Sequence, residues 1–370
     1  MDFLIETLRQ VTLPQVAMWI IGGVLIFLAI KKDIEPALLL PMGFGAILVN
    51  IPGSAVISEV EGEGGIIASL FKVGIQASEA MPLLLFIGIG AMIDFGPLLS
   101  NPKLFILGGA AQFGIFVTII LASMIGFPLA DAASIGIIGA ADGPTSILVA
   151  QRLQSHFTGA IMVVAYSYMA LVPIVQPAVV KMCTTKKERR IKMKYRASQV
   201  SKLTRILFPV LVTIISGLIA PASLSLVGML MFGNLIRECG ALNTLSDTAQ
   251  NTLSNLITLL LGITIAFQMQ AAQFIRWETL MIMGLGLFAF AFDTVGGVMC
   301  AKLMNLFSKE KINPMIGAAG ISAFPMAARV VEKMGIKEDS TNHLLMHAVG
   351  ANVSGQIASA IVGGLILTLI

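Results

Sequence analysis

The chain has 370 residues, of which 56% are hydrophobic and only 12% are charged, and its formal net charge is +4. Soluble domains carry about 25% charged residues, so this composition excludes an ordinary soluble domain. Apolar runs of roughly 20 residues, the length that crosses a bilayer, recur along the chain and predict a polytopic, all-α membrane protein. The three widely spaced cysteines, Cys183, Cys239 and Cys300, predict neither a disulfide framework nor a metal site.

In chain order, the first predicted element is a short amphipathic segment, residues 1–14, which we expect at the membrane interface because it mixes charged and apolar residues at helical spacing. The segments that follow amount to about ten or eleven membrane crossings, and several of them are short or broken by glycine and proline. Their expected positions are 15–31, 35–51, 66–76 with 80–93, 104–128, 131–150, 157–180, 204–220, 222–236, 250–269, 278–305, 311–330 and 342–370.

A basic loop, residues 181–205, separates a first membrane half, 15–180, from a second, 206–370. The loop holds ten Lys or Arg and a single Glu. Because basic loops stay on the cytoplasmic side, we expect a multi-pass protein of the cell membrane with this loop in the cytoplasm. The charge is either a topology signal alone or also a docking surface for an acidic partner or anionic lipid.

The first half contains an unusual polar interruption, IGAADGPTSILVA, at residues 138–150. A carboxylate inside the membrane costs a few kcal/mol and persists where it faces protein, water or an ion. Gly143 and Pro144 interrupt the helix and free backbone carbonyls beside Asp142. With the hydroxyls of Thr145 and Ser146, this forms a set of hard oxygen ligands suited to an alkali or alkaline-earth ion. Alternatively, Asp142 only caps a helix start at the membrane surface.

The second half contains a matching motif, because IGAAGISAFPMAAR at 316–329 aligns without a gap with 138–151. Broken segments at matching places in two halves are typical of transporter sites built on inverted repeats, although chance similarity of Gly/Ala-rich helices is the alternative. This half adds neutral oxygen donors that can bind an ion without adding charge. They are Asn313, Ser322, Asn352, Ser354 and Ser359.

Other polar residues of the membrane segments have two possible roles each. Tyr166 and Tyr168 are either interfacial anchors or donors of a hydroxyl ligand or proton. Asp94 and Asp293 each lie near a predicted helix end, where a scaffold role is expected. Arg329 either extends to the surface or binds an anionic substrate group.

The residues alone predict an ion-coupled transporter with a broken-helix site. Because the sequence has no Walker loop, dinucleotide fingerprint or GxSxG motif, we do not expect it to hydrolyse ATP. Three classes remain open: a primary sodium pump, a secondary transporter such as a sodium symporter or sodium/proton exchanger, and a membrane scaffold whose polar motifs only pack helices.

Five motifs narrow these classes. They are GAADGPTSI, AYSYMALVPIVQP, FDTVGGVMCAKLMN, INPMIGAAGISAFPMAARV and LLMHAVGANVSGQIASA. With them the chain resembles, from about residue 15 onward, the membrane β subunit of the sodium ion-translocating, biotin-dependent decarboxylases. The resemblance implies that the chain decarboxylates carboxybiotin on a partner carrier subunit, consumes a proton and exports Na⁺. The implied cofactors are therefore Na⁺ and biotin.

The resemblance also implies an architecture and partners. It implies a scaffold part and a mobile core part that moves like an elevator. It implies a cytoplasmic carboxyltransferase subunit, the biotin carrier, a small single-span membrane subunit and a homo-oligomer in the lipid bilayer. The compact chain favours the acyl-CoA decarboxylases, but the acid could be oxaloacetate, methylmalonyl-CoA, glutaconyl-CoA or malonate.

Matching each motif residue by residue assigns expected roles. The sodium ligands implied are Asp142, Asn352, Ser322 and Asn313. The catalytic residues implied are Asp142, Tyr168 and Arg329, and the residues implied in biotin binding are Arg329 and Gly317.

Overall fold

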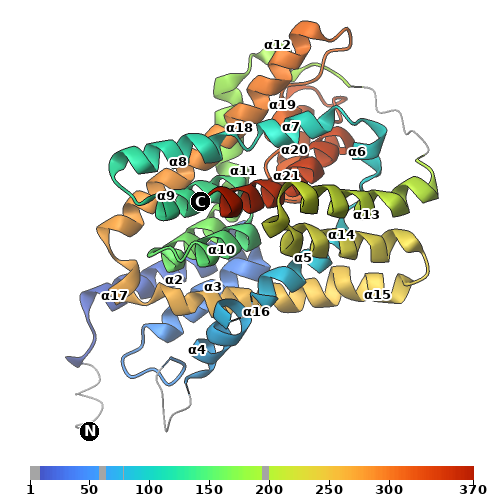
Figure 1. Ribbon diagram of the computed structural model, residues 1–370. Coiled ribbons are helices and arrows are strands. Elements are labelled where there is room, and N and C mark those ends of the chain that lie inside the picture. The colour runs from blue at the N-terminus through green and yellow to red at the C-terminus, as the bar shows by residue number, and fades with distance from the viewer. Residues whose placement is uncertain (1–8, 58–63, 78, 194–199) are drawn as a thin grey trace.

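The structure, a computed structural model, describes residues 9–57, 64–77, 79–193 and 200–370, and every regular element within these ranges is a helix (Figure 1). The predicted all-α class is therefore confirmed. Most of the predicted amphipathic segment, residues 1–8, and residues 194–199 of the basic loop lie outside the described ranges.

Within the described residues, 7 helical stretches are long and apolar enough to cross a membrane, or up to 8 if the bent pair α4–α5 counts as one span. These stretches are α2 (Leu13–Lys32), α7 with α8 (Leu104–Ala110 and Phe113–Ile125), α11 (Thr158–Cys183), α13 (Lys202–Ile219), α15 through α16 to η5 (Asn243–Met269), α18 (Trp277–Phe307) and α21 (Leu345–Leu369). Shorter helices are α3 (Pro36–Val49), α4 (Ile66–Phe71), α5 (Ala80–Met92), α6 (Gly96–Ser100), α12 (Lys186–Arg189), α14 (Leu224–Cys239) and α17 (Ala271–Phe274).

Two acids in the apolar regions bind the N-terminal ends of helices, although Asp293 itself lies in the middle of α18 and not near a helix end as predicted. Asp293 on α18 is fully buried, and its Oδ1 accepts a hydrogen bond of 3.1 Å from the N–H of Ile115 at the start of α8. Asp94 accepts 2.8 Å from the N–H of Gly96 and forms a 3.3 Å ion pair with Arg205. The first N–H groups of a helix lack intrahelical partners, so both acids stabilise helix starts.

The predicted crossing at 131–150 is wrong, because this segment folds back on itself. The chain enters along α9 and η2, turns at residues 141–142 and returns along α10. The two ends meet where the carboxylate of Asp131 accepts from the Ser155 hydroxyl at 2.7 Å and the His156 N–H at 2.9 Å. We call this unit hairpin 1. Its helices are α9 (Leu129–Gly136), η2 (Ile137–Ala140) and α10 (Gly143–Arg152).

The predicted crossing at 311–330 also folds back. Asn313 at its start and Glu338 at its end both bind Arg189 of the basic loop, so the two ends lie together. We call this unit, residues 313–338, hairpin 2. Its helices are α19 (Met315–Ala318) and α20 (Met326–Glu338), joined by a non-helical turn at 319–325.

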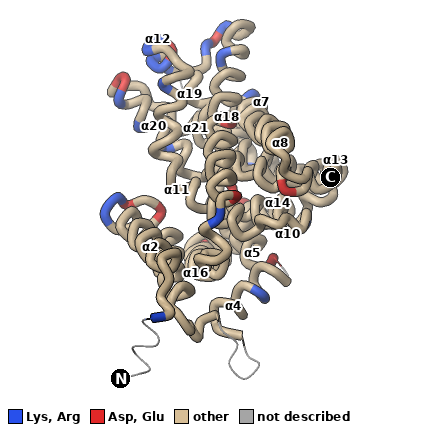
Figure 2. Tube along the Cα trace, turned by 90° about the vertical axis from the view of Figure 1, so that its left-hand side faces the viewer, with Lys and Arg blue, Asp and Glu red and all other residues tan. Residues whose placement is uncertain are grey.

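The two hairpins open toward opposite ends of the molecule. Hairpin 1 ends directly before α11, and the basic loop begins directly after α11. The 26 residues of α11 therefore separate the open end of hairpin 1 from the basic loop by roughly 39 Å. Figure 1 shows α12 at the top, beside α19 and α20, and Figure 2 shows that charged residues gather at this end. The tips meet inside the fold, where the Ser322 N–H donates to the Ala140 carbonyl at 3.0 Å.

Candidate ion-binding site

The tip of hairpin 1 is a tight turn forced by its sequence. Ala141 adopts the left-handed conformation, with φ 52° and ψ 45°, which is uncommon for a residue with a side chain. Asp142 is extended, and Pro144 occupies the first turn of α10, where its missing N–H is not needed. Gly143 packs against the ring of Tyr166, since an added Cβ would lie 2.4 Å from the Tyr166 Cζ. The break therefore places the carboxylate at the meeting point of the hairpins.

Neutral donors surround the carboxylate of Asp142. Its Oδ2 accepts from the Thr145 hydroxyl at 2.5 Å, from the Ser359 hydroxyl at 3.0 Å and from the Gln356 amide at 3.5 Å. The Ser359 hydroxyl also lies 3.1 Å from the Ser322 hydroxyl. The group thus draws on hairpin 1, hairpin 2 and α21.

The charge of Asp142 has no counter-ion among the residues that the structure describes. The residue is 3% exposed, and no ion pair to it occurs within the described residues. Burying an uncompensated carboxylate costs several kcal/mol. Either a proton or a bound cation must therefore neutralise the site.

Asn352 supplies a further oxygen at the second tip. Its amide N–H donates 2.6 Å to the carbonyl of Ile321, directly before Ser322. Its Oδ1 is buried and has no hydrogen-bond partner among the described residues. Native proteins rarely leave a buried polar atom unsatisfied, so this oxygen is available to a ligand.

The two tyrosines of α11 differ in their surroundings. The buried hydroxyl of Tyr166, whose ring lies against Gly143, has no partner in the described part of the chain. The Tyr168 hydroxyl instead donates to the carbonyl of Met283 on α18. Tyr166 is therefore the tyrosine beside Asp142, whereas the resemblance pointed to Tyr168.

Three other residues singled out in the sequence do not join this group. Asn313 uses both sides of its amide elsewhere, donating to the carbonyls of Arg189 and Ile191 at 2.9 and 2.8 Å and accepting from the Met315 N–H at 3.0 Å. Its amide is therefore engaged at the open end of hairpin 2, away from the Asp142 group. Gly317 packs backbone to backbone on Gly297 of α18, because an added Cβ would lie 2.0 Å from the Gly297 carbonyl oxygen.

Arg329 is exposed and lies in the first turn of α20, directly after the tip of hairpin 2. Its charge acts on Glu35, which lies between α2 and α3. Burial raises the pKa of Glu35, and the positive charge of Arg329 opposes that rise. Arg329 is thus an accessible cation close to the site but outside the oxygen group.

Gln356 is the contact that the sequence reasoning missed. Asn352, Gln356 and Ser359 are spaced at i, i+4 and i+7, which places them on one face of a helix. That spacing in GANVSGQIAS was the available signal. All three residues lie on α21, and their side chains are buried.

Comparison with known proteins identifies the family of the chain. Residues 14–370 match the family described as the Na⁺-transporting oxaloacetate decarboxylase beta subunit. The chain belongs to this family. It is 48% identical to the methylmalonyl-CoA decarboxylase subunit beta of Propionigenium modestum, covering 96% of this chain and 94% of that protein.

Other members of the decarboxylase beta subunit family align over similar lengths. The glutaconyl-CoA decarboxylase subunit beta of Acidaminococcus fermentans is 47% identical over 95% of this chain and 92% of its own length. The oxaloacetate decarboxylase beta chain of Klebsiella pneumoniae is 44% identical, with 95% and 94% covered. The resemblance seen in the motifs thus extends over nearly the whole chain.

Proposed function

We propose that this chain is the membrane subunit of a sodium-pumping decarboxylase and that Na⁺, its transported substrate, binds at Asp142. The observation that carries the proposal is a buried carboxylate, without a counter-ion in the described part of the chain, at the point where two opposed hairpins meet. Family membership supplies the type of reaction. Carboxylate, hydroxyl and amide oxygens are hard ligands, which suits Na⁺ rather than a soft metal.

The proposed ligands are oxygens that the fold holds close together or leaves unpaired. They are the Asp142 carboxylate, the Ser322 hydroxyl, the Asn352 carbonyl and the Tyr166 hydroxyl. Thr145 and Ser359 position the carboxylate. When Na⁺ leaves, a proton on Asp142 would keep the buried site neutral, so the site exchanges Na⁺ for H⁺.

The energy source is the loss of CO₂ from carboxybiotin on a partner carrier subunit, a step that consumes one proton. Arg329 is the proposed anchor for the anionic carboxyl group, since it is an exposed cation in the first helical turn after the tip. The basic face at α12 would be cytoplasmic by the positive-inside rule. Arg329 lies on the hairpin whose open end meets that face, which supports access to it by soluble carboxyltransferase and carrier subunits.

The hydrogen bond between Ser322 and Ala140 ties the two hairpins together. We propose that they move as one core against a scaffold of surrounding helices.

The shorter, acyl-CoA-type relatives are 47–48% identical to this chain, and the oxaloacetate-type relatives are 42–44% identical. This difference favours an acyl-CoA substrate for the whole enzyme.

The proposal is tested by CO₂ release from free carboxybiotin by the purified chain, with Na⁺ or with K⁺ at equal ionic strength. We expect release that Na⁺ stimulates and that Asp142→Asn abolishes. Na⁺ uptake into liposomes by the chain alone, with no CO₂ release even when partner subunits are supplied, would instead identify a secondary transporter.

A further inference from the structure

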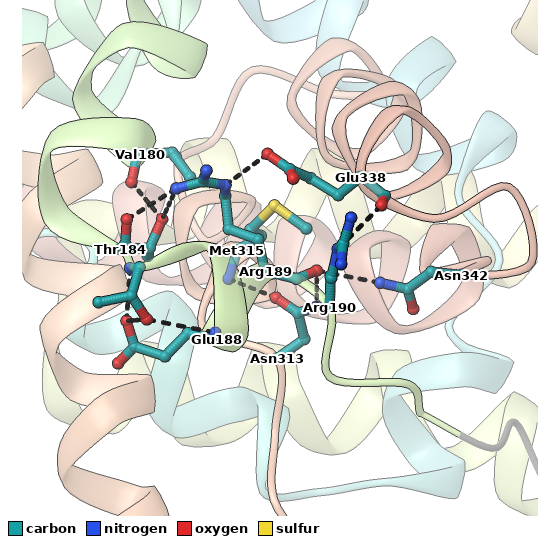
Figure 3. Close-up of polar contacts among 10 residues, drawn as sticks. Val180, Thr184, Glu188, Arg189, Arg190, Asn313, Met315, Glu338 and Asn342 are labelled. Atoms are coloured by element: carbon teal, nitrogen blue, oxygen red, sulfur yellow. Dashed lines mark hydrogen bonds and ion pairs between the residues drawn. The ribbon is translucent and has the colours of Figure 1, made fainter.

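Residues 184–192 of the basic loop form a strap across the open end of hairpin 2 (Figure 3). The strap begins at Thr184 directly after α11 and contains the short helix α12. A capping box between Thr185 and Glu188 starts that helix, and Glu188 forms a 3.1 Å ion pair with Lys302 of α18. The strap is therefore attached to two long helices that pass through the fold.

Arg189 connects the strap to the end of hairpin 2 through a largely buried ion pair. Its Nε lies 2.7 Å from Glu338 Oε1, with side chains only 13% and 15% exposed. Its Nη1 donates 2.7 Å to the Thr184 carbonyl. The hydrogen bond from Arg189 also lowers the pKa of Glu338, as expected when the charged form is stabilised.

The start of hairpin 2 is held by the backbone of the same residue. The buried amide of Asn313 donates 2.9 Å to the Arg189 carbonyl and 2.8 Å to the Ile191 carbonyl. Asn342, also buried, donates 3.1 Å to the Arg189 carbonyl. Arg189 thus binds both ends of the hairpin, one through its side chain and the other through its carbonyl oxygen.

A single helix, α20, connects the strap to the turn that forms the tip. From Glu338, the 13 residues of α20 lead back over roughly 20 Å toward the tip. The tip carries Ser322, whose N–H binds the Ala140 carbonyl beside Asp142. A displacement at Arg189 would therefore reach the oxygen group through α20 and the turn at 319–325.

We infer that Arg189 is a positioning residue for the proposed Na⁺ site: by fixing both ends of hairpin 2 it sets the place of Ser322 relative to Asp142. This inference rests on the proposed function. It also gives Asn313 a role, since its amide holds the strap against the hairpin.

The test measures binding of ²²Na⁺ to the purified full-length chain, independently of decarboxylation. Coupling between sites amounts to about 5- to 150-fold in affinity, so we expect Arg189→Ala to weaken Na⁺ binding at least fivefold. Turnover at saturating Na⁺ should change much less, because a positioning residue does not touch the reacting atoms. Arg189→Lys and the exchange Arg189→Glu with Glu338→Arg should recover part of the affinity.

Lys187→Ala is the matched control, because Lys187 lies in the same short helix and is exposed. Its Na⁺ affinity should equal that of the wild type. If Arg189→Ala does not fold, the double variant Arg189→Met with Glu338→Leu replaces it, because exchanging both members of a buried ion pair for apolar residues leaves no stranded charge.

Wild-type Na⁺ affinity in a folded variant that lacks the Arg189–Glu338 pair would overturn this inference alone. No Na⁺ binding by the wild-type chain would overturn the proposed function as well.

Discussion

The hydroxyl of Tyr166 offers the sharpest test of the proposed site, because Tyr166→Phe removes one buried oxygen and little else. In the structure this hydroxyl has no partner within the described residues, and an unsatisfied buried hydroxyl costs about 1–3 kcal/mol. Without Na⁺, the phenylalanine variant should therefore be as stable as the wild type or up to about 2 kcal/mol more stable. With Na⁺, losing one ligand worth about 1.4 kcal/mol should weaken binding tenfold.

The assay is thermal unfolding of the purified chain in detergent, titrated with Na⁺ against K⁺ at constant ionic strength, because a ligand that binds only the folded state raises stability with its concentration. Tyr168→Phe is the control two residues away. It removes the hydroxyl bonded to the Met283 carbonyl, which should cost about 1 kcal/mol of stability and leave the Na⁺ midpoint unchanged. A Na⁺ midpoint that shifts in Tyr168→Phe but not in Tyr166→Phe would refute the reasoning.

Three further outcomes follow from the structure. Asp142→Asn should keep the fold, because its amide oxygen can still accept from Thr145, but it should bind no ²²Na⁺; near-normal binding would move the ion site elsewhere. Gly317→Ala should be strongly destabilising, since its Cβ would lie 2.0 Å from the Gly297 carbonyl oxygen, and an unfolding temperature equal to that of the wild type would contradict this packing. Because the pKa of Glu338 is lowered in the folded state, its ion pair should stabilise the chain above the ordinary glutamate pKa and lose that effect as the pH falls through the lowered value. The stability difference between wild type and Glu338→Gln, measured by thermal unfolding from pH 7 to pH 3, should therefore shrink. A difference that persists at pH 3 would argue against the pair.

The sequence was sufficient for the composition-driven features. Low charge and long apolar runs predicted an all-α membrane protein, and the acid followed by Gly143 and Pro144 predicted a break with a carboxylate at it. Both are local properties, since helix interruption depends on the residues at the break. Asp142, Ser322 and Asn352 could be singled out because each is polar within an apolar segment.

The course of the chain after each break could not be predicted from hydropathy. Residues 131–150 have the length and apolarity of one crossing, and only the contact of Asp131 with Ser155 shows that the chain returns to the side from which it came. The contacts of Asn313 could not be predicted for the same reason. It lies nine residues before Ser322, at the base of the hairpin, so it meets the strap rather than the ion group.

Asp293 and Asp142 show why a buried carboxylate alone does not define an ion site. The Oδ1 of Asp293 accepts from the backbone N–H of Ile115 at a helix start, and its Oδ2 is buried without a hydrogen-bond partner among the described residues. A backbone N–H has no lone pair with which it could also bind a cation. Asp142 is held by the hydroxyls of Thr145 and Ser359, and a hydroxyl can either donate a hydrogen or present its lone pairs. The same groups can therefore stabilise the carboxylate without an ion and ligate Na⁺ with one. A lysine or arginine in place of Thr145 or Ser359 would neutralise Asp142 permanently and remove the need for a cation. No basic side chain pairs with Asp142 within the described residues, and this is what would make the proposed exchange of Na⁺ for H⁺ chemically feasible.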